Sequence, residues 1–144
     1  MSILAIDYGA KKIGLAKSDQ GHTMALPLQV IRSKDKDDLL SQLSQVCQEH
    51  EIAQIIVGVP VSLSGGPRQE NLLRQVDLAN KHMQEVLDFV EWLKSNLHLP
   101  VAVEDERLST KMANTLMKGE AKGQDDDAVA AMLILQNYLD RLKH

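Results

Sequence analysis

The chain has 144 residues, a length that fits one compact domain of about 100–150 residues and excludes a two-lobed enzyme. Apolar residues make up 44% and aromatic residues only 3%, so we expect an aliphatic core and little stacking of bases on exposed rings. The formal net charge of −4 argues against a protein that coats DNA or a membrane surface, but not against an enzyme acting on nucleic acid. The single cysteine, Cys47, excludes an internal disulfide and a cysteine zinc site. Without a long apolar run or a signal sequence, the expected location is cytoplasmic.

The first third of the chain holds three short apolar segments, which predict three strands at Ser2–Tyr8, Ile13–Ser18 and Ala25–Ile31. The gaps between them are short, which favours an antiparallel meander. Pro27 has no N–H to donate, so we expect the third strand to lie at an edge of the sheet or to contain a bulge.

The rest of the chain alternates between helical and extended patterns. A helix is predicted at Asp35–Glu51, with Ser33 suited to its start. The later expected elements are a buried strand at Gln54–Val59, a long helix at Leu72–Leu97, a strand at Val101–Glu104, and helices at Ser109–Lys118 and Asp127–Lys143. The apolar stripe around Phe89 and Trp92 is expected to pack internally rather than form a dimer face. This order predicts an α/β fold of the RNase H-like kind, a single domain over residues 1–144 whose mixed sheet has three antiparallel strands, then parallel strands, flanked by helices.

Asp7 is the first candidate functional residue. It stands at the carboxyl end of a hydrophobic strand, where open α/β sheets bind ligands, and a carboxylate there is costly unless it is paired or bound to metal. The ordinary alternative is an aspartate that opens a tight turn with Gly9.

A second group of acids follows the predicted strand at Val101–Glu104. Strand alternation sends Asp105 to one face of the sheet and Glu104 and Glu106 to the other, without selecting a functional residue among them. Arg107 would hold one of these carboxylates or meet a phosphate. A solvated acidic loop before a helix is the simpler alternative.

Three aspartates open the last predicted helix, where acids suit the helix dipole and capping is the ordinary explanation. Asp127 differs from Asp125 because it shares a helical stripe with Ile134 and Tyr138 on the apolar face. A carboxylate on such a stripe is unusual, so Asp127 is the third candidate.

The three candidates together suggest a metal site, since convergent carboxylates bind hard divalent cations and two such ions catalyse phosphodiester hydrolysis. The five histidines are scattered without zinc-motif spacing and are expected at the surface.

Four segments of the chain resemble the YqgF/RuvX family of pre-16S rRNA nucleases. The opening segment Leu4–Ala16 (LAIDYGAKKIGLA) is similar to the first motif of that family. The other three occur in the family's order: Ile56–Pro60 with Leu63–Gly65, Asp105–Thr110, and Asp127–Ala131 with Leu135–Leu139. The resemblance therefore spans nearly the whole chain.

The resemblance implies an RNase H-like fold, similar to that of Holliday-junction resolvases. It implies a metal-dependent endonuclease that hydrolyses phosphodiester bonds in 5′-end maturation of precursor 16S ribosomal RNA, in the bacterial cytoplasm. It assigns both the catalytic and the metal-binding roles to Asp7, Glu106 and Asp127, with Mg²⁺ or Mn²⁺ as the cofactor. The family motif favours Glu106 over Asp105.

By the same analogy, Lys11, Lys12 and Arg107 are expected to contact substrate phosphates. The expected partner is nucleic acid, either structured RNA or branched DNA, with no membrane association and a monomer or homodimer as the active form. The sequence departs from the family at two places. A longer central stretch is expected to extend the long helix or add a turn over Pro67–Gln84. The shorter segment before Asp127 lacks a basic cluster, which weakens the case for strong RNA binding there.

Three other functions compete with this one. A Holliday-junction-resolvase-like DNA nuclease would use the same site, because substrate choice rests on surface shape. Asp7, Gly9 and Gly14 also resemble the first phosphate loop of the actin and sugar-kinase superfamily, but those phosphotransferases close two lobes around ATP. A non-catalytic ribosome-assembly factor that binds RNA is the third alternative.

Overall fold

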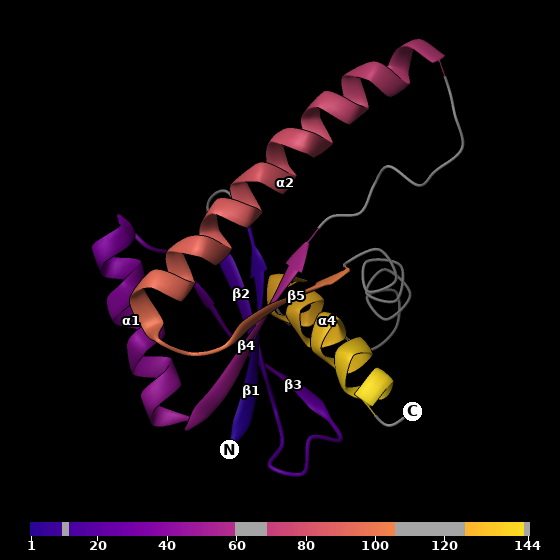
Figure 1. Ribbon diagram of the computed structural model, residues 1–144. Helices are drawn as coiled ribbons and strands as arrows, with labels where there is room; N and C mark the ends of the chain where they lie inside the picture. The colour runs from indigo at the N-terminus through magenta and orange to yellow at the C-terminus, as the bar shows by residue number, and fades with distance from the viewer. Residues whose placement is uncertain (10–11, 60–68, 106–125, 143–144) are drawn as a thin grey trace.

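The computed structural model describes residues 1–9, 12–59, 69–105 and 126–142, and for residues 69–80, 105 and 126–127 it describes the backbone alone. These residues form one sheet with helices packed on both of its faces (Figure 1). The strand order across the sheet is β3-β2-β1-β4-β5. The elements run in the order β1 (Ser2–Tyr8), β2 (Ile13–Ser18), β3 (Ala25–Ile31), α1 (Lys36–Glu49), β4 (Ile52–Val59), α2 (Gln69–Leu97), β5 (Val101–Asp105) and α4 (Asp126–Leu142).

The strand directions confirm the predicted mixed sheet. β1, β2 and β3 are antiparallel neighbours, whereas β4 pairs parallel to β1 and β5 pairs parallel to β4. The carboxyl ends of β1, β4 and β5 therefore meet at one edge of the sheet, as the fold class requires. The helix expected at Ser109–Lys118 lies outside the described residues.

Pro27 has the predicted effect on β3, which is an edge strand of the sheet. The register between β2 and β3 shifts beside it, since Leu15 pairs with Gln29 and Ala16 with Pro27. The strand thus has both features that a residue without an N–H requires.

The cap of α1 differs from the prediction by two residues, although the helix begins within one residue of the predicted start. The N-cap is Asp35 rather than Ser33, and its carboxylate accepts a hydrogen bond of 2.8 Å from the N–H of Asp38. Serine and aspartate are equally good capping residues, so residue type alone did not distinguish Ser33 from Asp35. The backbone is extended at Asp35, as it is at an N-cap, and this identifies Asp35 as the cap.

The two faces of the sheet carry separate cores. On one face, α1 and α2 bury mainly Leu, Ile, Val and Phe side chains, including Phe89, which is 3% exposed. On the other face, α4 packs its small and aliphatic side chains, among them Ala131 and Ile134, against the strands. Figure 1 shows α1 and α2 on one side of the strands and α4 on the other. The aliphatic core predicted from composition is thereby confirmed, as is the internal packing around Phe89.

The helix α2 is 29 residues long and begins at Gln69, so the described part of the expected extension over Pro67–Gln84 is helical. Its buried residues lie in the second half, at Val86, Phe89, Val90 and Leu93. The first half continues past the edge of the sheet (Figure 1). Within the described ranges, no helix combines the length and apolar character needed to cross a membrane.

Candidate active site

Asp7 is the penultimate residue of β1 and is partly buried at the carboxyl edge of the sheet. Residues alternate between the two faces along a strand. Ile3 and Ala5 belong to the core under α4, whereas Leu4 and Ile6 belong to the core under α1 and α2. Position 7 therefore falls on the face covered by α4, the helix whose first turn includes Asp127.

Asp7 has a glycine beside it on each neighbouring strand. On β2 its partner is Gly14. On β4, Val57 pairs with Ile6, and the same register places Gly58 next to Asp7. Because neighbouring strands lie about 4.8 Å apart, a side chain at either position would stand directly beside the carboxylate on the same face of the sheet. The two glycines themselves place no side chain on either side of Asp7.

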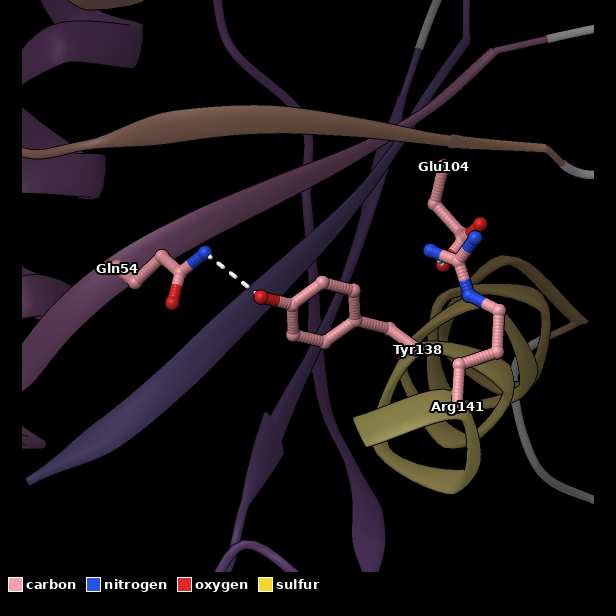
Figure 2. A network of polar contacts seen from close by, with 4 residues as sticks. All are labelled: Gln54, Glu104, Tyr138 and Arg141. Atoms are coloured by element: carbon pink, nitrogen blue, oxygen red, sulfur yellow. Dashed lines mark hydrogen bonds and ion pairs between the residues drawn. The ribbon is translucent and has the colours of Figure 1, made fainter. Parts of the chain in front are cut away.

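Glu104 lies on the same face, two strands from Asp7. It pairs with Gly58, which places its backbone about 10 Å from that of Asp7, or two strand spacings. The Glu104 side chain is only 6% exposed, and its Oε2 accepts a hydrogen bond of 2.5 Å from Nη2 of Arg141 on α4. Figure 2 shows this pair bridging β5 and the end of α4.

A second contact from the same end of α4 reaches β4. The amide of Gln54 donates a hydrogen bond of 3.1 Å to the hydroxyl of Tyr138 (Figure 2). The Arg141 guanidinium lies 6.0 Å from the centre of the Tyr138 ring. These contacts fix α4 across the strands whose carboxyl ends form the candidate site.

Sequence reasoning missed the partner of Glu104, because it considered only the adjacent Arg107. An acid that alternates with apolar residues along β5 is a signal for a buried carboxylate. Nothing in the sequence indicates that its partner is Arg141, 37 residues away.

Glu106 and Arg107 follow the last residue of β5 and lie outside the described residues, as does Lys11. For Asp105 the structure describes the backbone, which pairs with Val59 one step beyond Glu104. Asp105 therefore occupies the opposite face from Glu104 in the strand alternation, as predicted. The preference for Glu106 over Asp105 stays a prediction.

Asp127 belongs to the first turn of α4, and its side chain is not among those described. Ala131 and Ile134 follow it on the same helical stripe, and both are fully buried against the sheet. The predicted packing face of this helix is confirmed. Among the described side chains, no group of three or more His, Cys, Asp or Glu is placed to hold a metal. That search covers Asp7 but not Glu106 or Asp127, so their convergence stays a prediction.

Gly9, two residues after Asp7, lies where the chain turns from β1 towards β2. The N–H of Gly9 donates a hydrogen bond of 3.1 Å to the carbonyl oxygen of Lys12. A Cβ at position 9 would lie 2.6 Å from that oxygen, closer than such atoms approach. Glycine therefore allows the tight turn that brings Lys12 beside the end of β1.

Comparison with known proteins shows which family the chain belongs to. Residues 1–141 match the family model described as "RuvX: Holliday junction resolvase". The chain belongs to the RuvX family. Relatives from Rickettsia peacockii and Rickettsia typhi are both named "Putative pre-16S rRNA nuclease". The first is 33% identical over 99% of this chain and 88% of its own, and the second is 34% identical over 98% and 86%.

Solved structures with the same fold include the Thermus thermophilus protein RuvC in complex with a Holliday junction substrate. It has a TM-score of 0.55 at 13% identity and covers 99% of this chain and 96% of its own. The fowlpox virus resolvase, solved with Holliday junction DNA, gives a TM-score of 0.52 at 13% identity and covers 100% of both chains. At these identities the likeness establishes the fold. It confirms the predicted RNase H-like architecture for this RuvX family member.

Proposed function

We propose that this RuvX family protein is a metal-dependent endonuclease that hydrolyses phosphodiester bonds in nucleic acid, with residues 1–144 acting as one domain. The observation that carries the proposal is the setting of Asp7. This carboxylate stands at the carboxyl edge of the sheet, between Gly14 and Gly58, on the face covered by α4. The family match to resolvases supports a nuclease.

The donor set fits hard divalent cations, because the proposed ligands Asp7, Glu106 and Asp127 offer carboxylate oxygens alone. Bound Mg²⁺ or Mn²⁺ would supply an activated water and stabilise the leaving oxygen. The chain itself fixes Asp7 on a rigid strand and keeps the neighbouring positions free of side chains. We propose that a phosphate group approaches the carboxylate along this edge of the sheet.

The positive residues near the site would orient the substrate. Lys12 is held at the end of β1 by the turn at Gly9. We propose that it contacts substrate phosphates together with Lys11 and Arg107, which neutralises charge that the carboxylates would otherwise repel.

The substrate we propose is structured RNA, in 5′-end maturation of precursor 16S ribosomal RNA in the cytoplasm. The names of the curated relatives support this choice. Branched DNA is the second candidate, supported by the description of the family model. Both substrates present the same phosphodiester to the same site, so the shape of the surface decides between them.

A cleavage assay tests the function. The protein is incubated with precursor 16S ribosomal RNA or with a four-way DNA junction, in Mg²⁺, in Mn²⁺ or in a chelator. We expect metal-dependent cleavage of the RNA and its loss in Asp7→Asn, which keeps the shape of the side chain but removes its charge. A cut junction with an intact precursor would reverse the substrate assignment. Cleavage by Asp7→Asn at the wild-type rate would exclude the site.

Paired substitutions test the other two acids. We expect Glu106→Gln and Asp127→Asn to abolish cleavage, and Asp105→Asn to retain it. Circular dichroism checks that each variant is folded. Loss of activity in Asp105→Asn but not in Glu106→Gln would exchange the roles of these two neighbours.

A further inference from the structure

A pocket of about 190 Å³ opens at the same edge of the sheet as Asp7, but on the face covered by α1 and α2. Its walls come from the end of β1, the β1–β2 turn, the segment before α1, and α2. Its lining includes the rings of Tyr8 and Phe89 and the charged residues Lys12, Lys34, Asp35 and Lys36. The pocket thus adjoins the candidate active site across the end of β1.

The pocket is positively charged although the protein is negative overall. Three of its lining residues are lysines and one is an aspartate, whereas the whole chain has a net charge of −4. Lys12 comes from the β1–β2 turn, and Lys34 and Lys36 flank the cap of α1. Two distant segments therefore bring positive charge to one cavity.

Helix capping explains the acid in this pocket but not the lysines. The Asp35 carboxylate accepts the N–H of Asp38, as an N-cap does. A cation at the N-terminus of a helix opposes the helix dipole, so the dipole does not favour Lys34 and Lys36 at this position. Asp37 and Asp38 also lie in the first turn of α1, but they do not line the pocket. The charged lining of the cavity is therefore mainly cationic, which suits an anion.

The pocket has an apolar wall opposite these charges. The rings of Tyr8 and Phe89 stack with their centres 4.3 Å apart, and Phe89 in turn stacks with Trp92 at 5.8 Å. The ammonium of Lys36, a lining residue, lies 5.5 Å from the centre of the Trp92 ring. A cationic rim and an apolar wall suit a phosphate and its attached ribose.

The size of the pocket limits the kind of ligand that it can hold. Its volume is below the range of about 300–1,000 Å³ that is typical of sites for whole small molecules. The cavity fits one sugar-phosphate unit of a longer strand better than a free nucleotide with its base. Its place beside Tyr8, the residue after Asp7, puts such a unit close to the candidate active site.

We propose that this pocket binds a backbone phosphate of the nucleic-acid strand, next to the phosphate that is cleaved at Asp7. The inference rests on the proposed nuclease function and adds Lys34 and Lys36 as substrate-binding residues. The strand would pass over the end of β1, with one phosphate on the α4 face and a neighbouring phosphate in the pocket.

Binding measured separately from cleavage tests the proposal. Fluorescence anisotropy is recorded in Mg²⁺ with labelled precursor RNA and with a labelled four-way junction, at several salt concentrations. The protein carries Asp7→Asn so that the substrate stays intact. Lys34→Gln and the double variant Lys34→Gln/Lys36→Gln are compared with Lys94→Gln, a control that removes one exposed charge from α2 outside the pocket. Lys34 precedes the helix, so its single variant keeps the Lys36–Trp92 contact.

We expect the double variant to bind about five- to tenfold more weakly. The slope of log affinity against log salt should fall by about 0.7, because the pocket then neutralises one phosphate fewer. The single variant should show part of this change, and the control should bind within about twofold of its parent. Unchanged affinity and slope in both pocket variants would overturn the proposal.

A cleavage assay with Asp7 restored separates this proposal from the nuclease function. Cleavage by the wild type together with unchanged binding in the pocket variants overturns the pocket alone. Binding that depends on Lys34 and Lys36, without cleavage in either metal, supports the pocket and overturns the nuclease function. Failure to bind either nucleic acid overturns both.

Discussion

Removing Arg141 or Glu104 from their ion pair should lower the stability of the protein by different amounts. The Glu104 side chain is 6% exposed and that of Arg141 is 65% exposed. Arg141→Met removes the guanidinium from a carboxylate that is held away from water, whereas Glu104→Gln removes the charge that faces a guanidinium exposed to water. Losing one partner of a fully buried pair costs about 3–5 kcal/mol. Since Arg141 is largely exposed, we expect about 2 kcal/mol for Arg141→Met and about 1 kcal/mol for Glu104→Gln.

Urea unfolding of the wild type, both single variants and the double variant measures these costs. The coupling energy from the cycle should be about 1–2 kcal/mol. In melting temperature, each kcal/mol corresponds to about 2–4 °C for a chain of this size. The exposed pair of Lys94 and Glu91, 3.8 Å apart on α2, is the matched control, and Lys94→Met should cost less than about 0.5 kcal/mol.

Two results would refute this reasoning. Equal losses in Arg141→Met and Lys94→Met would show that burial of Glu104 does not strengthen its pair. A larger loss in Glu104→Gln than in Arg141→Met would show that removing the guanidinium from the buried carboxylate is not the main cost.

Four further predictions follow from the described residues. Gly9→Ala should destabilise the protein by about 1–3 kcal/mol in urea, because its Cβ would meet the Lys12 carbonyl oxygen at 2.6 Å. Ile134→Ala, at a fully buried position under α4, should cost about 2–5 kcal/mol in the same measurement. Hydrogen bonds, first from the Thr23 hydroxyl and then from backbone N–H groups, lower the pKa of Asp19 below 3.8. Its contribution to stability is present above pH 3.8 and is lost as the pH falls through the lowered pKa, so Asp19→Asn should flatten the fall in the urea midpoint from pH 5 to 3. Millimolar Mg²⁺ or Mn²⁺ should raise the melting temperature by binding the native state, and an unchanged melting temperature in both metals would count against a preformed site.

The strands were predictable because their patterns are local. Short apolar runs between turn residues set all five strands, and the missing N–H of Pro27 placed β3 at an edge. The helix α1 was predictable to within a turn at its start. Its exact cap depends on the backbone geometry at Asp35, which two equally suitable capping residues leave open.

Contacts between distant segments were not predictable in the same way. The stack of Tyr8, Phe89 and Trp92 joins β1 to α2, and the helical stripe around Phe89 and Trp92 did not identify Tyr8 as its partner. The pocket unites lysines from the β1–β2 turn and from the start of α1. The aromatic stack and the pocket both depend on how separate elements pack against one another. The periodicity of the sequence does not predict that packing.

The glycines around Asp7 serve different purposes that only the sheet makes visible. Gly9 is needed for the turn, because a Cβ there would strike the Lys12 carbonyl oxygen. Gly14 keeps one side of Asp7 without a side chain, because the antiparallel pairing of β2 puts it directly opposite Asp7. Gly58 belongs to a segment more than 40 residues later, and the parallel pairing of β4 gives it the same role on the other side. A mixed sheet with β1 between an antiparallel and a parallel neighbour is what brings two glycines from unrelated segments beside one carboxylate.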